Sequence, residues 1–151
     1  MARLDRRPTR LCLSPEQLQG LIEFFKSQDD VLALYLYGSY GTEYQTDLSD
    51  IDLAVLPMPG VRWDYAREAR LQTEVIDLGR SEDISLVNLR RVPVTLQINV
   101  LETGRLLYVR DRAMLADFVE SVILRYCDFL PDLENLYRDF DIGIKEEFCD
   151  R

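Results

Sequence analysis

Two uninterrupted apolar segments constrain the fold of this chain more than any other feature. The first is VLALYLY at residues 31–37, and the second is IDLAVL at residues 51–56, which Pro57 and Pro59 follow. A strand that is apolar at every position is typical of a sheet covered on both faces, because alternate side chains point to opposite faces. We therefore expect an α/β fold in which helices are interleaved with these strands.

The remaining segments predict helices and further strands around this pair. Ser14, Pro15 and Gln17 are typical of a helix start, with Ser14 as the N-cap and Gln17 completing a capping box. Asp111 is expected to cap a long helix, which Pro131 should end. We expect a small mixed β-sheet flanked by helices and closed by a helical C-terminal extension. The expected elements are a helix from 14 to about 28, helices at 62–78, 93–101 and 111–130, strands at 83–89 and 105–109, and a last helix after 131.

The length and charge of the chain indicate one domain with two unlike ends. Its 151 residues, 47% apolar and 30% charged, are enough for a single core. We divide it into a basic arm at 1–13, a core at 14–110 and a C-terminal extension at 111–151. Residues 128–151 hold eight acids against three bases. A docking surface for a basic partner would explain this excess, but a solvated helix face is favoured.

The composition excludes several kinds of chemistry. The chain has no histidine, and its three cysteines lack the spacing of a zinc site or a disulfide framework. Catalysis must therefore use carboxylates, hydroxyls, Arg, Lys or a hard metal ion. The net charge of −9 disfavours direct nucleic-acid binding. No segment reaches the ~20 apolar residues that span a bilayer, and no signal-peptide core follows the N-terminus, so we expect a cytoplasmic protein without membrane contact.

The segment between the two apolar strands carries the residues that point to a reaction. Gly38 and Ser39 directly follow the first strand, and the N–H groups of Ser39 and Tyr40 near a helix start would suit an anion such as a triphosphate. Ten residues later, Asp50 and Asp52 flank one residue at the start of the next strand, so they share a face about 6–7 Å apart. Such a pair can bind Mg²⁺ together with substrate phosphates.

Each half of this arrangement is weak evidence by itself. A Gly-Ser pair is usually a turn, and a Ser-Asp-x-Asp sequence is usually a solvated loop. At this spacing, between two buried strands, the two halves together favour phosphoryl or nucleotidyl transfer.

The same residues carry a resemblance to a known family. Gly38-Ser39, ten residues and then Asp50-Ile51-Asp52 resemble the signature of the DNA polymerase beta-like nucleotidyltransferases. The wording LYLYGSYG, LSDIDLAVL and, further on, LRRVP…VLETGRLLYVRDR is similar to the minimal nucleotidyltransferase antitoxins. These antitoxins are partners of HEPN-domain ribonuclease toxins in type VII toxin–antitoxin pairs. The resemblance covers about residues 14–140.

The resemblance implies a nucleotidyltransferase fold and a protein adenylyltransferase. Antitoxins of this group transfer AMP from Mg·ATP to a tyrosine of the toxin, with which they form a complex. By the resemblance, Gly38 and Ser39 hold the triphosphate, and Asp50 and Asp52 bind Mg²⁺. Tyr40 is a further candidate for nucleotide contact, although packing at a helix start would also explain it.

Two positions depart from the pattern of this group. The third acid is expected on the third strand, where counting back from Leu89 gives Ser85, with Asn88 in place of a following acid. Asp83 lies two residues before Ser85 and is our candidate for the third acid, as metal ligand and catalytic base, if the strand register is shifted. Thr42 replaces a residue that is often basic.

Two other functions remain open at this point. The chain could be a binding module that neutralises its partner by covering it, which Ser85 and Thr42 favour. It could also modify a small hydroxyl compound such as an aminoglycoside, although it is short for a separate substrate domain.

Three residues outside the motif have predictions of their own. Arg90 and Arg91 are expected near the active-site edge, either as phosphate contacts or as a solvated pair. Trp63 is expected to pack in the core or at its rim.

Overall fold

The computed structural model describes residues 13–38, 51–80 and 83–138, with side chains described as far as Leu130. Within these ranges, four strands form one sheet and four helices flank it. The elements are α1 (Pro15–Lys26), β1 (Val31–Tyr37), β2 (Ile51–Pro57), α2 (Tyr65–Gly79), β3 (Ile84–Asn88), α3 (Val94–Thr103), β4 (Arg105–Val109) and α4 (Arg112–Arg138).

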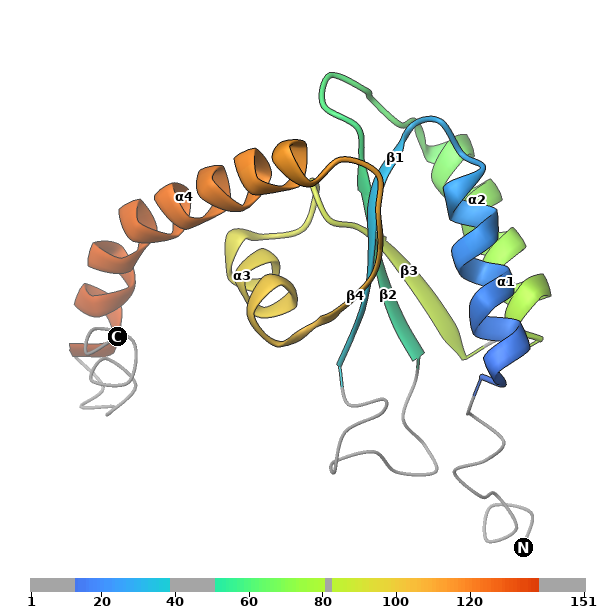
Figure 1. The fold of residues 1–151 in the computed structure, drawn as a ribbon. Helices are drawn as coiled ribbons and strands as arrows, with labels where there is room; N and C mark the ends of the chain where they lie inside the picture. The colour runs from blue at the N-terminus through green and yellow to red at the C-terminus, as the bar shows by residue number, and fades with distance from the viewer. Residues whose placement is uncertain (1–12, 39–50, 81–82, 139–151) are drawn as a thin grey trace, which may run out of the picture.

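The sheet is mixed, with the strand order β3-β2-β1-β4. β1 pairs antiparallel with both β2 and β4, whereas β3 pairs parallel with β2. In Figure 1, α1 and α2 cover one face of the sheet, and α3 and the start of α4 lie on the other. The α/β fold with a small mixed sheet, which the sequence predicted, is confirmed.

The two apolar strands are buried because each faces two cores at once. Leu34 and Leu53 belong to a cluster with α1 and α2, whereas Tyr35, Ala54 and Leu56 belong to a second cluster with α3 and α4. All five are at most 6% exposed. The alternation of a strand therefore supplies side chains to both layers, which is why neither strand has a polar face.

The helix starts follow their capping residues. Ser14 and Gln17 form the predicted capping box at α1. The carboxylate of Asp111 accepts a hydrogen bond from the N–H of Met114 at 3.1 Å, which satisfies a free donor in the first turn of α4. α2 begins at Tyr65 rather than at 62, because Asp64 is its N-cap.

The prediction that Pro131 ends the long helix is wrong. α4 runs without interruption from Arg112 to Arg138, and it leaves the body of the protein as a curved arm (Figure 1). Proline removes one backbone donor and clashes with the preceding turn, but this can bend a helix without ending it. Of the last predicted helix, residues up to 138 belong to α4, and 139–151 lie outside the described residues.

None of the described helices is long and apolar enough to cross a membrane.

Leu34→Ala is expected to lower the free energy of unfolding by about 2–5 kcal/mol, because it leaves a cavity between the sheet and α1 and α2. Urea unfolding followed by circular dichroism measures this. Leu124→Ala makes the same change at a side chain that is 59% exposed, and it should alter the free energy by less than about 0.5 kcal/mol. Equal effects would contradict the description of the core.

Candidate active site

Three residues form a row across the sheet at the end where β1 stops and β2 starts. Asp52 pairs in register with Tyr37 of β1 on one side and with Ser85 of β3 on the other. Their neighbours Ala54 and Val87 pack in the α3–α4 cluster, so the row lies on that face of the sheet. The site therefore combines three strands that are far apart in sequence.

The carboxylate of Asp52 lies directly against Gly38. Gly38 has a positive φ of 82°, and a Cβ at this position would lie 2.6 Å from Oδ2 of Asp52. A side chain here would both strain the backbone and displace the carboxylate. Glycine is therefore required at this position, because it lets the Asp52 carboxylate lie against the backbone.

Ser85 holds the other oxygen of the same carboxylate. Its hydroxyl donates a hydrogen bond to Oδ1 of Asp52 at 2.9 Å. Ser85 is thus the β3 residue in register with Asp52, at the position where the resemblance leads one to expect an acid.

Gln72 of α2 fixes the backbone around Ser85. Its amide nitrogen donates to the carbonyl of Ile84, and its amide oxygen accepts from the N–H of Leu86, both at 2.8 Å. Because β3 is an edge strand, these two groups would otherwise lack a partner strand. The amino-acid sequence does not reveal this positioning residue, since a glutamine within a helix gives no signal of its contact with a strand.

Asp83, the candidate third acid, is exposed and lies one residue before β3 begins. Its backbone carbonyl accepts a hydrogen bond from the N–H of Ile51 at 3.0 Å, so its peptide already belongs to the pairing of β2 with β3. Its proposed role as metal ligand and base stays a prediction.

The other predicted site residues, Ser39, Tyr40 and Asp50, lie outside the described residues. So does Thr42. Among the residues that are described, no group of three or more acidic or cysteine side chains could hold a metal ion. What the structure does provide is the carboxylate of Asp52, a hard oxygen ligand of the kind that Mg²⁺ prefers, so the residue fits a metal site.

Burial and the nearby negative charge of Asp52 both raise the pKa of Tyr37. Its phenol therefore stays protonated at neutral pH and cannot serve as the base of the site. Tyr35, two residues earlier in β1, has its pKa raised by burial alone.

Asp52→Asn is therefore expected to lower the pKa of Tyr37 toward its ordinary value and to leave that of Tyr35 unchanged. NMR titration of ¹³C-labelled tyrosine, assigned with Tyr→Phe variants, measures both. Ionised Tyr37 is disfavoured in the folded state, so the free energy of unfolding should fall as the pH rises above about 10. This fall should be smaller in Asp52→Asn than in the unaltered protein. A pKa of Tyr37 that does not respond to the variant would contradict the contact.

The prediction that Arg90 and Arg91 lie near the active-site edge is wrong. β3 runs parallel to β2, so the residues after β3 lie at the opposite end of the sheet from Asp52. There, Nε of Arg90 donates to the carbonyl of Pro57 at 2.9 Å, and Arg91 pairs with Glu68.

The prediction for Trp63 is confirmed, since its side chain is 9% exposed and packs in the α1–α2 cluster.

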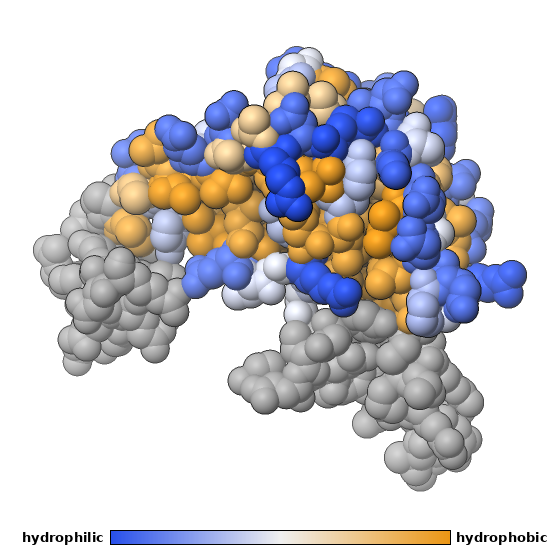
Figure 2. Space-filling view, in the orientation of Figure 1, coloured by the Kyte–Doolittle hydropathy of each residue, from blue (hydrophilic) through white to orange (hydrophobic). Residues whose placement is uncertain are grey.

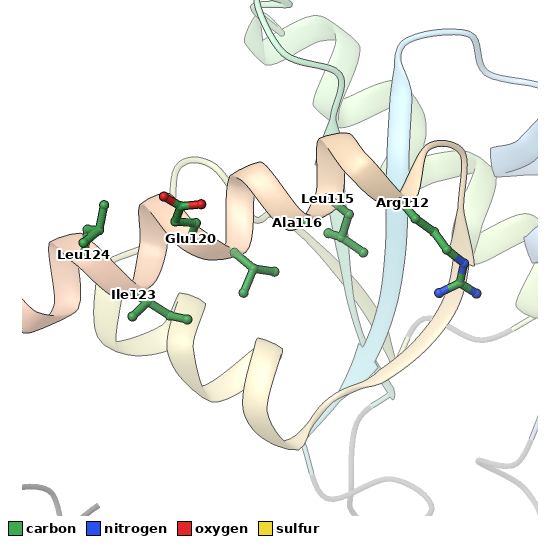
Figure 3. Close-up of a pocket in the computed structure, with 7 residues that line it drawn as sticks. Arg112, Leu115, Ala116, Glu120, Ile123 and Leu124 are labelled. Carbon is green, nitrogen blue, oxygen red and sulfur yellow. The ribbon is translucent and has the colours of Figure 1, made fainter.

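An apolar groove on α4 is a second feature that sequence analysis did not resolve. It has a volume of about 420 Å³. Figure 3 shows Arg112, Leu115 and Ile123 along one side of α4, with Glu120 and Leu124 beside them. Ile123 is 47% exposed and Leu124 59%. Figure 2 shows hydrophobic surface along this arm between hydrophilic margins. The apolar stripe of α4 thus extends beyond what the core covers.

A family model described as "Polymerase beta, Nucleotidyltransferase" matches residues 19–113, which is more than half of the chain and includes the whole row around Asp52. The chain belongs to this family. The matched range contains Gly38 and Asp52. None of the curated proteins compared with the chain matches it.

Several solved structures share the fold of this nucleotidyltransferase. One is the complex of the tri-AMPylated HEPN toxin of Shewanella oneidensis with MNT antitoxin. The matched chain has 23% sequence identity and a TM-score of 0.66, and the match covers 83% of this chain and 97% of the matched chain. A toxin–antitoxin structure with AMP-PNP has 24% identity and the same TM-score and coverage. The MntA–HepT toxin–antitoxin structure has 21% identity, a TM-score of 0.64 and again the same coverage.

Proposed function

We propose that this nucleotidyltransferase is an antitoxin that transfers AMP from Mg·ATP to a tyrosine hydroxyl of a HEPN ribonuclease toxin and so inactivates it. The observation that carries the proposal is the contact of Asp52 with Gly38, because it joins the two halves of the sequence signature in space. Similar structures support it, since one is a tri-AMPylated HEPN toxin in complex with MNT antitoxin and another is a toxin–antitoxin with AMP-PNP.

The proposed reaction forms one P–O bond and breaks another. The tyrosine oxygen attacks the α-phosphorus of ATP, pyrophosphate leaves, and the phenolic proton passes to a base, for which Asp83 is our candidate. Gly38, Ser39 and Tyr40 would hold the nucleotide. Oδ2 of Asp52 lies against Gly38, and Ser85 donates to Oδ1 and keeps the carboxylate in this orientation.

Asp50 and Asp52 are the proposed ligands of Mg²⁺, with Asp83 as a third. The ion would neutralise negative charge that develops on the phosphates during transfer. The hydrogen bond from Ser85 to Oδ1 fixes the orientation of the Asp52 carboxylate as a proposed ligand.

We expect AMP-sized mass increments on a partner HEPN toxin after incubation with the chain, ATP and Mg²⁺. Asp52→Asn should lower the rate about a hundredfold or more, because it removes a charged ligand while Ser85 can still donate to the amide oxygen. Intact-mass spectrometry measures both. Asp77→Asn is the matched control, an exposed residue of α2 that should leave the rate unchanged.

A second candidate function is neutralisation by binding alone, which the position of Ser85 favours. Ser85 lies on β3 in register with Asp52, where the resemblance leads one to expect an acid. A hydroxyl without an activator is a poor base. The same assay separates the two functions. A toxin that is inhibited without ATP, and whose mass does not change with ATP, would support binding alone and contradict transfer.

The apolar groove of α4 is the surface on which we propose that the toxin docks. An exposed apolar surface of this kind marks protein contact sites, and the similar structures are complexes of an antitoxin with a toxin. Leu115 and Ile123 would contribute the apolar contact, and Arg112 and Glu120 would supply polar groups at its margin.

Ile123→Lys should weaken binding of the HEPN toxin at least about tenfold without unfolding the protein, because it places a charge in the groove at a half-exposed position. Isothermal titration calorimetry measures the affinity. Thr73→Lys adds the same charge to an exposed position of α2, on the other face of the sheet, and should have no effect. Equal loss in both variants would indicate a general charge effect and contradict docking on α4.

A further inference from the structure

A polar cavity of about 550 Å³ lies at the end of the sheet opposite Asp52. The loop between β2 and α2 forms one wall, and the loop between β3 and α3 forms the other. In Figure 1 the first of these loops is at the top, whereas β1 ends and β2 begins at the bottom. The volume of the cavity falls in the usual range of small-molecule sites, about 300–1,000 Å³.

The position of the cavity in the fold favours a ligand site. β2 and β3 are parallel, and both carboxyl ends meet there. Ligands of open α/β sheets bind outside the carboxyl ends of parallel strands, because the loops diverge there. Asp64 and Tyr65, at the N-terminal end of the 15-residue helix α2, also line the cavity, so the positive end of the helix dipole faces it.

Positive charge exceeds negative charge around the cavity. Arg62, Arg90 and Arg91 line it, whereas Asp64 is the only acid among the described residues of the lining. The carboxylate of Asp64 already caps α2 by accepting from the N–H of Arg67 at 2.8 Å. Arg91 is partly neutralised by Glu68 at 2.6 Å. The lining therefore presents an excess of cationic donors.

Arg90 carries a half-buried charge that no carboxylate of the described residues neutralises. Its Nε is bound to the carbonyl of Pro57, and its guanidinium lies over the ring of Phe118. Burial and the nearby positive charge of Arg125 lower its pKa. An anion in the cavity would offset this unfavourable burial of charge.

Asn88 supplies a neutral donor in the same cavity. Its side chain is 8% exposed, and its Oδ1 accepts from the N–H of Arg90 at 2.9 Å. Its Nδ2 group makes no hydrogen bond to another described residue and is not among the buried polar atoms left without a partner, so it is accessible from the cavity. An accessible amide donor of this kind can donate to the acceptor oxygens of a ligand.

We propose that this cavity binds the phosphate group of a small molecule through Asn88, Arg62 and Arg90, separately from the Asp52 site. Inorganic phosphate and a mononucleotide share this chemistry. Tyr65, 85% exposed among the lining residues, offers a ring on which a base could stack. The proposal concerns the opposite end of the sheet and does not depend on the proposed transfer of AMP.

Trp63 is the one tryptophan of the chain and lines the cavity, so its fluorescence and its indole N–H resonance report binding there. The full chain is titrated with sodium phosphate and with AMP at constant ionic strength. We expect saturable changes at Trp63 and Asn88 that Asp52→Asn does not alter. If the unaltered chain binds AMP more tightly than phosphate, and Tyr65→Ala binds the two with equal affinity, the ligand is a nucleotide. If the unaltered chain already binds the two with equal affinity, the ligand is free phosphate.

Asn88→Asp is the decisive variant. It keeps the oxygen that accepts from the N–H of Arg90, but it replaces the free donor with a negative charge, and it should weaken phosphate binding at least tenfold. Arg62→Gln should weaken binding severalfold, whereas Arg70→Gln, an exposed residue of the same region that does not line the cavity, should not.

Three results would overturn the proposal. They are the absence of a saturable response to either probe, an unchanged affinity in Asn88→Asp, and an equal loss in Arg62→Gln and Arg70→Gln. Thermal unfolding of each variant checks its fold, and if Asn88→Asp is unfolded, the comparison of Arg62→Gln with Arg70→Gln still decides. None of these results bears on the transfer assay, which depends on Asp52.

Discussion

The pairing of β1 with β2 is the interaction on which both the core and the site depend. Its register places Tyr37 opposite Asp52, and Gly38 consequently lies against the Asp52 carboxylate. A slip of one residue would move Asp52 to the α1–α2 face and bury a charge there, while Leu53 would leave its core. Because Leu34, Leu53 and their neighbours fill two apolar layers, the register that packs the core also builds the site.

The parallel strand β3 completes this arrangement, and it places a serine where a third acid is expected. It brings Ser85 beside Asp52 and leaves Asp83 just outside the strand. Gln72 fixes the edge of β3 on both sides of Ser85, so the hydroxyl has a defined position. A hydroxyl that orients a carboxylate is compatible with catalysis by another base and equally with a site that has lost its chemistry. The transfer assay distinguishes these cases.

The three surfaces of interest are separated by the topology of the sheet. Asp52 lies where β2 begins, the arginine-rich cavity lies where β2 and β3 end, and the groove lies on α4, which leaves the body as an arm. A nucleotide, an anion and a protein partner could therefore bind without competing for the same residues. Each surface also has a distinct chemistry, namely the carboxylate of Asp52, the arginine and amide donors of the cavity, and exposed Leu124 and Ile123.

The sequence by itself determined the features that depend on neighbouring residues. The two apolar strands and the capping box at Ser14 follow from burial and capping, and the motif places Gly38 where the first apolar strand ends and Asp52 where the second begins. Tertiary structure decided what depends on distant contacts. The position of Arg90 followed from the direction of β3, the role of Gln72 from an edge strand, and the continuation of α4 through Pro131 from a helix that tolerates one missing donor. Local patterns do not contain these outcomes, because strand direction and partner choice are set by which apolar faces meet in the folded chain.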